Sequence, residues 1–353
     1  MVKIIFFSPD AEGTAIRHLC LAGYVALQAK TVEELTRLVA AEQPAALVGS
    51  EQQLHACAQV IEGTGVKTIP LKSNIRLSSL VFEVMRHCPI YRKAIVTYLD
   101  ILGFRKLIEN ENPERVRRIL HATRDRIDVG SFGFEDADDD GDEDGPLYRK
   151  DDAFTLNFSD LTLRLTLLSA KEALQDRISM ELRNLCEMQL DLARKDGIFM
   201  RGAVSHGDLF MDGDYVFGPG LVRSYELAEK VAVFPRIILD PDLIKEVNRA
   251  TGKEPDPRWH YFCQRADDGV YYLDYLFKSI SVRVPIWTES VLQGHKQAIE
   301  ESFARVSSTD QRARQKLVWT ALYHNSTLRR FKDEAAQLPF DELEISEQTI
   351  SGT

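Results

Sequence analysis

The 353-residue sequence lacks several features that would assign a protein to a class at once. Its longest apolar stretches are broken by charged residues before they reach the roughly eighteen that a membrane span requires, so we expect no membrane-spanning segment. Its five cysteines are scattered and odd in number, with no CxxC pair, which argues against a disulfide framework and against a zinc site. The motifs GxGxxG and GxxxxGKS/T are absent, so no Walker-type phosphate loop is expected. The apolar run at the start is too short for a signal peptide, and we expect a cytoplasmic protein.

The sequence is also poor in clustered positive charge. A net charge of −10 does not suit broad nucleic-acid binding, because phosphate contacts need grouped lysines and arginines. Much of the acidic excess lies in the segment EDADDDGDEDG, from Glu135 to Gly145, which is typical of a solvated loop. Its carboxylates do not follow EF-hand spacing, so a solubilising insert is favoured over a calcium site.

Residues 1–88 alternate between strand and helix signals. The runs KIIFF, YVALQA, AALVG and VKTIPL are typical of buried strands, and GTAIRHLCLAG and TVEELTRLVAAEQ of helices, the second opened by a threonine cap. This alternation predicts a small doubly wound α/β domain with a parallel sheet. The stretch GYVALQAKTVEELTRLVAAEQPAALV resembles a response-regulator receiver domain.

The receiver resemblance lacks the residue that accepts phosphate. Gly49 and Ser50 hold the place of the family's phosphoacceptor aspartate, and only Asp10 stands where an acidic pair is expected. Lys72 matches the family's lysine at the end of the last strand. We therefore expect a pseudo-receiver that serves packing or dimerisation rather than phosphorylation.

Residues 89–285 show a second pattern. The strand AIVTYLDIL is followed by one long helix, RKLIENENPERVRRILHATRDRI, two neighbouring strands, AFTLNF and LTLRLTLL, a helix from about Lys171 to Lys195, and the strand IFMRGAVSHG. The order strand, helix, strand, strand, helix, strand predicts a split βαβ, ferredoxin-like core. Residues 286–353 are expected to form a C-terminal helical extension, helical from about Trp287 to Leu338, with a frayed tail from Asp341.

The stretch YLDILGF, Tyr98 to Phe104, places a carboxylate in an apolar strand. A buried carboxylate is costly unless a cation or hydrogen-bond donors meet it, so Asp100 needs a partner. In a ferredoxin-like core we expect the first strand beside the strand that follows the first crossover helix, with the Ser159-Asp160 turn against its end. Two carboxylates facing one site suit Mg²⁺ or Mn²⁺. Alternatively, Asp100 is a helix cap and Asp160 an ordinary hairpin residue.

Three stretches together carry a more specific resemblance. YLDILGF, NFSDLTLRL and RGAVSHGDLFMDGDYVFGPGLVRSYELAE resemble, in order and spacing, the catalytic domain of class III nucleotide cyclases, and most of all the bacterial pyrimidine cyclases of Pycsar antiphage systems. The resemblance implies two divalent metal ions per site, held by Asp100, Asp160 and the backbone carbonyl of Ile101. His206, in VSHGD, is interpreted as a turn residue rather than a general base.

The sequence departs from adenylyl cyclases at the base pocket. These enzymes read adenine with a lysine four residues before the second aspartate and an aspartate three residues before the next glycine, where this chain has Leu156 and Tyr215. Leu156 offers no hydrogen bond, so adenine is disfavoured, and Tyr215 suits stacking on a smaller base. Tyr225 either lines the base pocket or packs in the core.

The sequence also departs from the family at the ribose and transition-state positions. A gapless match places Val222 and Glu226 where the family has an asparagine and an arginine. Arg223 is the candidate replacement for the transition-state arginine, with Arg201 as second choice. Either arginine could instead serve an ordinary salt bridge.

The resemblance implies a homodimer whose active sites are shared, because the family's sites lie between two catalytic domains. The expected reaction converts UTP, or CTP, to the 3′,5′-cyclic monophosphate and pyrophosphate, with UTP favoured, and a separate effector protein senses the product. Two alternatives stay open: a purine cyclase with an unfamiliar base pocket, and a degenerate cyclase fold that binds a nucleotide or a partner without catalysis.

Overall fold

The computed structural model describes residues 1–8, 13–71, 77–129, 153–168, 174–212, 215–281, 283–332 and 338–351. The chain forms two compact units, Met1–Ala94 with Thr166–Glu172 and Gly207–Leu221, and Ile95–Leu165 with Ala173–His206 and Val222–Thr353. Asp10, Lys72 and the acidic segment 135–145 lie outside the described residues. Across the described part of the chain, none of the helices combines the length and apolar character needed to cross a membrane.

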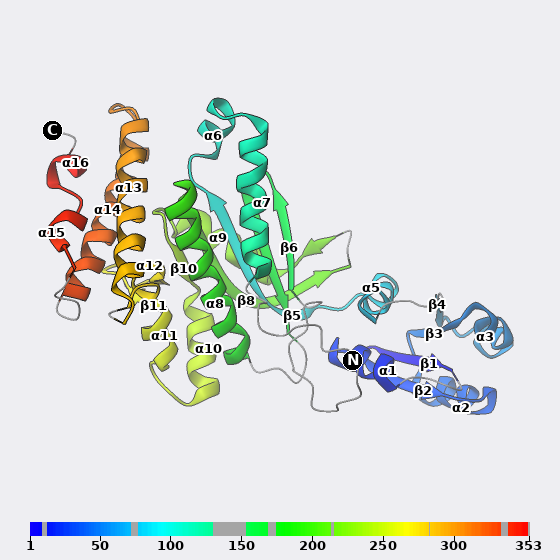
Figure 1. The fold of residues 1–353 in the computed structure, drawn as a ribbon. Coiled ribbons are helices and arrows are strands. Elements are labelled where there is room, and N and C mark those ends of the chain that lie inside the picture. Colours follow the sequence, from blue (N-terminus) through cyan, green and yellow to red (C-terminus); the bar gives the residue numbers. More distant parts are fainter. Residues whose placement is uncertain are drawn as a thin grey trace. The chain divides into compact units, whose positions relative to one another are not determined.

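The N-terminal unit contains a sheet of four parallel strands in the order β2-β1-β3-β4 (Figure 1). Its elements are β1 (Lys3–Phe7), α1 (Gly13–Leu21), β2 (Val25–Ala29), α2 (Val32–Glu42), β3 (Ala46–Ser50), α3 (Glu51–Ala56), α4 (Ala58–Ile61), β4 (Lys67–Leu71) and α5 (Leu77–His87). One hydrophobic cluster joins the sheet to α1 and α5, and a second joins its other face to α2 and α3. The predicted doubly wound arrangement is therefore confirmed.

The end of β3, where a receiver would carry its phosphoacceptor, serves as a helix cap. The Ser50 hydroxyl accepts from the Gln53 N–H at 3.3 Å, and the Gln53 side chain accepts from the Ser50 N–H at 2.8 Å. This reciprocal capping box satisfies two backbone donors at the start of α3. The residues at this position therefore have a structural role.

A larger sheet has the order β11-β12-β10-β8-β5-β7-β6 and belongs mostly to the second unit, while β9 and the end of β8 with which it pairs belong to the N-terminal unit. Its strands are β5 (Arg92–Ile101), β6 (Ala153–Phe158), β7 (Leu161–Leu167), β8 (Met200–Met211), β9 (Val216–Phe217), β10 (Ile237–Leu239), β11 (Cys263–Arg265) and β12 (Tyr271–Leu273). The helices that accompany it are α6 (Phe104–Asn110), α7 (Pro113–Val129), α8 (Leu174–Asp191), η2 (Leu192–Asp196), α9 (Pro219–Lys230), α10 (Pro241–Thr251), α11 (Pro257–Phe262), α12 (Tyr275–Lys278), α13 (Pro285–Arg305), α14 (Gln311–Lys332), α15 (Phe340–Leu343) and α16 (Glu347–Ser351).

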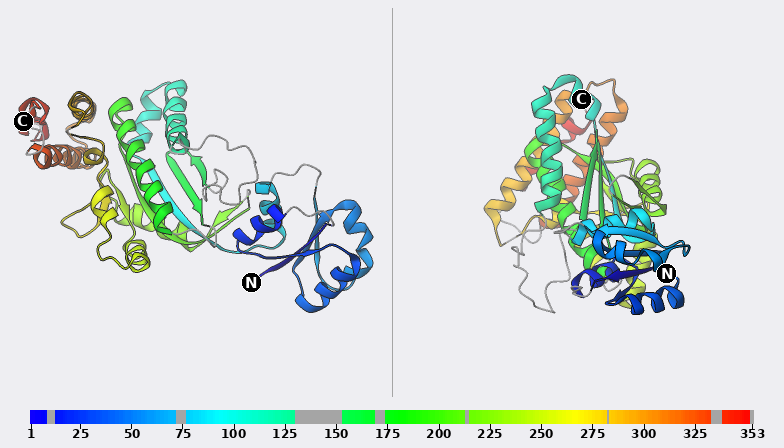
Figure 2. Two further views of the ribbon diagram at one scale, coloured as in Figure 1. Left: turned by 60° about the horizontal axis from the view of Figure 1, so that its bottom comes forward. Right: turned by 90° about the vertical axis from the view of Figure 1, so that its right-hand side faces the viewer.

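Four strands of this sheet, β8-β5-β7-β6, have the order of a ferredoxin-like core, which confirms the predicted fold class. One detail of the expectation is wrong. The strand that follows the crossover helices, β6, was expected beside β5, but β7 lies there instead. The helices α7 and α8 pack against each other over one face of these strands (Figures 1 and 2). The core is extended by the parallel strand β10 and the antiparallel strands β12 and β11.

One expected long helix is divided, and the expected C-terminal helical segment consists of separate helices. The segment predicted as one helix after β5 forms α6 and α7, because Pro113 starts a new helix and the side chain of Asn112 accepts from the Arg115 N–H at 2.9 Å. The segment expected to be helical from Trp287 to Leu338 forms α13 and α14. Asp310 accepts from the Ala313 N–H at 3.1 Å at the start of α14.

The prediction of a frayed tail from Asp341 is wrong. Leu343 and Ile345 are buried, with exposed fractions of 3% and 1%. The Asn325 side chain on α14 donates to the Ile345 carbonyl at 2.8 Å and accepts from the Ile345 N–H at 3.0 Å. The tail therefore docks on α14 through apolar burial and a paired amide.

The C-terminal helices also enclose a pair of histidines. His324 Nε2 lies 3.0 Å from the Leu343 carbonyl, which can only accept, so this nitrogen carries the proton. His324 Nδ1 then accepts from His295 Nδ1 at 3.0 Å, and His295 Nε2 accepts from the Tyr275 hydroxyl at 2.8 Å. Burial lowers the pKa of both imidazoles, His324 to about 4, so the pair is neutral.

Candidate active site

Asp100 lies near the end of β5, on the sheet face opposite α8. Strand side chains alternate between the two faces, so Thr97 and Leu99 point one way and Tyr98 and Asp100 the other. Thr97 donates to Glu181 on α8 at 2.8 Å, which identifies the helix-covered face. Tyr98 instead meets the ring of Tyr225 on α9, edge to face, with centroids 5.5 Å apart. Asp100 thus belongs to the α9 face.

Asp160 lies in the two-residue turn between β6 and β7. Ser159 has a φ of 60°, the left-handed conformation that such a tight turn uses. The Ile101 N–H donates to the Asp160 backbone carbonyl at 3.2 Å, so the turn is attached to the end of β5. The charge of Asp160 also helps to raise the pKa of Asp100. The structure therefore brings together the two aspartates that the sequence singled out.

The partner that Asp100 meets directly is Arg201 on the neighbouring strand β8. Arg201 Nε donates to Asp100 Oδ2 at 2.6 Å, and Nη2 donates to Glu229 on α9 at 2.7 Å. Arg201 Nη1 also donates to the Ala228 carbonyl at 3.3 Å. The next residue is Gly202, where a Cβ atom would collide with the Tyr98 carbonyl, so only glycine allows β8 this close to β5. We call Asp100, Arg201 and Glu229 the open cluster.

Burial dominates the electrostatics of the open cluster. Desolvation raises the pKa of Asp100, the hydrogen bond and charge of Arg201 oppose this effect, and the charges of Asp160 and Glu229 add to it. Burial acts to lower the pKa of Arg201, but the pairing with Asp100 and Glu229 outweighs it and the pKa is raised. Desolvation is also the main cause of the raised pKa of Tyr98, and the negative charges of Glu229 and Asp100 raise it further. Asp100 is thus an imperfectly compensated carboxylate, a common property of functional sites.

The donor chemistry fits a hard divalent cation. Asp100, Asp160 and the Ile101 carbonyl are oxygen donors at one end of β5, and Mg²⁺ is commonly held by one or two carboxylates with water and substrate phosphates. Among the described residues, no group of three or more His, Cys, Asp or Glu side chains is placed to hold a metal ion. A metal here would therefore take its remaining ligands from a phosphate-bearing substrate and from water.

The other predicted arginine, Arg223, lies on α9 and binds a different aspartate. Its Nε donates to Asp240 Oδ2 at 2.9 Å and its Nη2 to Asp240 Oδ1 at 2.8 Å. Asp240 is 2% exposed and also caps α10 through the Asp242 N–H. The side chain of Arg223 is 42% exposed. The structure thus places Arg223 in a salt bridge of its own.

The predicted base-pocket residues are dispersed. Tyr225 is half exposed on α9 and touches Tyr98, so it adjoins the open cluster. Leu156 is partly exposed on the edge strand β6. Tyr215 belongs to the N-terminal unit and is exposed, and its N–H donates to Asp212 at 2.9 Å in a hairpin turn. Only Tyr225 is linked to the aspartates by described contacts.

Sequence reasoning missed Glu229 and Tyr98, although both carried a signal. Tyr98 lies two residues before Asp100 on the same strand, and Glu229 lies four residues after Tyr225 on the same helix. Residues two apart on a strand, or four apart on a helix, share a face. Extending the search from each candidate by these periods would have found both residues.

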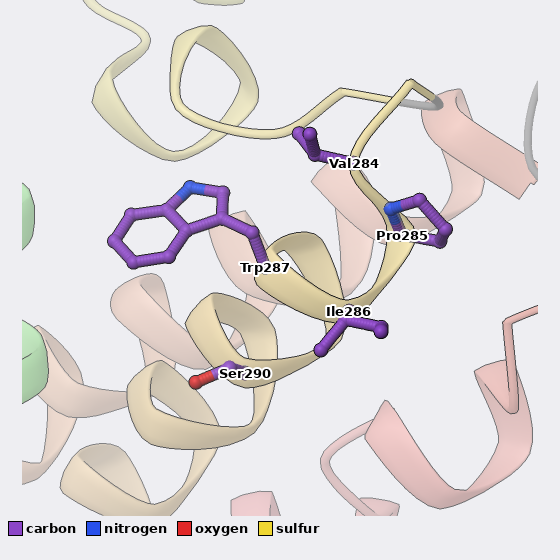
Figure 3. A pocket seen from close by; sticks show the side chains of 5 residues that line it. All are labelled: Val284, Pro285, Ile286, Trp287 and Ser290. Atoms are coloured by element: carbon purple, nitrogen blue, oxygen red, sulfur yellow. The ribbon is translucent and has the colours of Figure 1, made fainter.

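A shallow pocket of about 500 Å³ occurs elsewhere in this unit, at the start of α13 (Figure 3). It is lined by Val284, Pro285, Ile286, Trp287 and Ser290. Its side-chain polar groups are the Ser290 hydroxyl and the Trp287 indole N–H, and neither provides acid–base or metal-binding chemistry. The candidate site is therefore at the open cluster.

No protein-family model and no curated protein sequence matches the chain. Among solved structures it is similar to the adenylyl cyclase CyaB from P. aeruginosa, with 15% identity and a TM-score of 0.35 over 52% of this chain and 94% of that chain. It is also similar to two structures of a bacterial light-regulated adenylyl cyclase, each 12% identical. One has a TM-score of 0.35 over 60% of this chain and 68% of that chain, and the other 0.34 over 58% and 100%. TM-scores of this size do not establish a shared activity.

Proposed function

We propose that the chain is a nucleotide cyclase that converts a pyrimidine nucleoside triphosphate to its 3′,5′-cyclic monophosphate and pyrophosphate. The observation that carries this proposal is the attachment of the Asp160 turn to the end of β5, through the Ile101 N–H, which brings the charges of Asp100 and Asp160 together. A pair of carboxylates at one strand end is what a metal-dependent phosphoryl-transfer site requires.

Each residue of the site has a distinct task in this proposal. Asp100, Asp160 and the Ile101 carbonyl hold two Mg²⁺ or Mn²⁺ ions. Bound there, the ions would activate the ribose 3′-hydroxyl as a nucleophile and stabilise charge on the departing pyrophosphate. Arg201 neutralises Asp100 when no metal is bound, so a metal ion competes with the guanidinium for that carboxylate. Catalysis then rests on positioning and electrostatics, since no covalent bond to the protein is needed.

The proposed transition-state residue is Arg223, with Arg201 as the alternative. Asp240 binds Nε and Nη2 of Arg223, which leaves Nη1 free of described hydrogen bonds, and the side chain is partly exposed. A positioned guanidinium facing the phosphates would contribute on the order of 10²–10³ in rate.

A pyrimidine is proposed because Leu156 provides no hydrogen bond to read adenine, and Tyr225 and Tyr215 offer aromatic faces to a small base. The side chains of Leu156, Tyr215 and Tyr225 are each partly or largely exposed. UTP is favoured over CTP from the Pycsar resemblance. On the same basis we propose a cytoplasmic role in antiphage defence, with cyclic UMP sensed by a separate effector.

A homodimer is proposed to complete the site. Large apolar side chains are exposed on α9, at Val222 and Tyr225, and on β6, at Leu156 and Phe158. A second copy covering these surfaces would remove them from water, which is favourable for association. A two-fold dimer would form two equivalent sites.

The test is to incubate the protein with ATP, GTP, CTP or UTP and Mn²⁺ and to identify products by mass spectrometry. Cyclic UMP or cyclic CMP as the dominant product supports the proposal. Cyclic AMP or cyclic GMP as the dominant product would replace it with the purine alternative.

One observation favours a second candidate, a cyclase fold that binds nucleotide without catalysis. Both candidate arginines are already engaged by carboxylates, Arg201 by Asp100 and Glu229, and Arg223 by Asp240. Calorimetry of UTP binding, combined with the product analysis above, separates the two functions. Tight, metal-dependent UTP binding with no cyclic product from any of the four triphosphates would favour the binding module.

A further inference from the structure

The C-terminal helix α14 brings an additional cation, Lys316, to the open cluster. Trp319, one turn further along α14, stacks on Phe234, just after α9, with centroids 5.9 Å apart and planes 11° apart. The start of α14 is tied to α6 by the Lys106–Asp310 salt bridge at 2.6 Å. These contacts hold α14 along the elements that carry Asp100 and Glu229.

The electrostatics agree with this placement. Burial lowers the pKa of Lys316, the positive charges of Arg201 and Arg312 lower it further, and the charges of Asp100 and Glu229 oppose them. Lys316 therefore lies within electrostatic range of Arg201, Asp100 and Glu229.

Lys316 differs from Arg201 in that no carboxylate of the described residues is in direct contact with its ammonium. Arg201 is paired with two carboxylates, whereas the Lys316 ammonium makes no salt bridge or side-chain hydrogen bond among the described residues. A partly buried ammonium is costly unless an anion meets it. The three cations Arg201, Lys316 and Arg312 face the three carboxylates Asp100, Asp160 and Glu229.

We propose that Lys316 is a substrate-binding residue whose ammonium binds the terminal phosphates of the nucleoside triphosphate. This inference rests on the proposed cyclase function and adds a polyphosphate contact from the C-terminal helical region. A lysine ammonium is a compact point charge well suited to phosphate oxygens. It would complement metal ions at Asp100 and Asp160, which would contact the same polyphosphate from the β5 side.

The experiment compares Lys316→Gln and Lys316→Arg with Lys332→Gln, a matched lysine on an exposed part of the same helix. The probe is inorganic tripolyphosphate with Mg²⁺, measured by isothermal titration calorimetry. We expect Lys316→Gln to weaken binding roughly 10-fold to 100-fold, as loss of a charge-assisted hydrogen bond does. Arginine should restore most of the affinity, and Lys332→Gln should leave it unchanged.

A kinetic measurement separates a binding role from a structural one. Lys316→Gln should raise the KM for the triphosphate more than it lowers kcat, with unchanged thermal unfolding and unchanged affinity for uridine, which has no phosphate. Wild-type tripolyphosphate affinity in Lys316→Gln, or no binding by the wild type, would overturn the inference. If the wild type cyclises no nucleotide but loses tripolyphosphate binding on Lys316→Gln, the cyclase proposal fails and the anion site stands.

Discussion

The two faces of the central sheet each carry an arginine–carboxylate pair, yet the pairs differ in their access to water. On the α8 face, Arg164 and Glu181 lie 2.5 Å apart with side chains 8% and 2% exposed. On the α9 face, Arg201 and Asp100 lie 2.6 Å apart with side chains 15% and 19% exposed, and Glu229 is 37% exposed. We call Arg164, Glu181 and Thr97 the sealed cluster.

The contact distances are nearly equal, so the surroundings must distinguish the two clusters. Glu181 is satisfied on both oxygens, by Thr97 and by Arg164, under a covering helix. Asp100 shares its arginine with Glu229 and is coupled to a further carboxylate at the sheet end, so its pKa is raised. The sealed cluster is therefore expected to contribute to stability and the open cluster to chemistry.

The largest expected effect is on activity at the open end of the sheet. Asp160→Asn keeps the shape of the turn but removes a metal-binding charge, so we expect cyclase activity to fall on the order of 10³-fold. Product formation from UTP with Mn²⁺ measures the loss. Asp176→Asn, at an exposed aspartate on α8, is the matched control and should retain activity. If the Asp160→Asn enzyme stays active, the proposal that Asp160 binds the metal ions is wrong.

The sealed cluster should respond in stability instead. Glu181→Gln removes the carboxylate that pairs with the buried Arg164 guanidinium, and we expect the free energy of unfolding to fall by about 3 kcal/mol. Urea denaturation measures the change, and specific activity per folded molecule should stay near the wild-type value. Loss of activity at unchanged stability would mean that Glu181 acts in the site and that the contrast between the faces is wrong.

The histidine pair of the C-terminal helices extends the comparison to a neutral buried network. The pKa of His324 is about 4 in the fold and about 6.5 in the unfolded chain, so the unfolded state binds the extra proton between these values. Stability should therefore rise with pH from about 4 to 6.5, by about 3 kcal/mol from this residue. Denaturation at several pH values measures the slope. His324→Gln, which keeps one donor and one acceptor, should flatten it, and an equally steep slope in the variant would contradict the assignment.

The smallest expected effect concerns the stability contribution of Asp100. Its folded pKa is raised above the unfolded value, so its negative charge opposes folding at neutral pH, and this effect disappears as pH falls through the raised pKa. Asp100→Asn should therefore keep or increase the melting temperature at pH 7 while abolishing activity. The difference from wild type should narrow in acid. A marked loss of stability at pH 7 would place Asp100 with the sealed cluster.

The proximity of Asp100 and Asp160 could be predicted from the sequence, because the order of strands and helices along the chain determines the order of strands in this kind of sheet. The expected neighbour of β5 was wrong, yet the Ser159-Asp160 turn belongs to both β6 and β7, so either neighbour brings it to the end of β5. The doubly wound N-terminal sheet was predictable for a similar reason, since alternating apolar runs mark its strands and helices.

The cationic partner of Asp100 could not be predicted with the same certainty. Which β8 residue faces Asp100 depends on the register between two strands about a hundred residues apart, and sequence periodicity does not define it. The sequence therefore offers Arg201 as second choice for the transition state or as a salt-bridge arginine, without identifying Asp100 as its partner. The position of Lys316 depends on how α14 packs, which rests on ring contacts such as Trp319 on Phe234.

The docked tail has a consequence for how the chain reaches its final form. Asn325 is 4% exposed, and both polar atoms of its amide are matched by the backbone of Ile345. Until synthesis passes Ile345, that amide has no partner inside the helical region, so α14 cannot complete its packing on the ribosome. A chain shortened before Ile345 should share this defect, and affinity tags are better placed after Ser351.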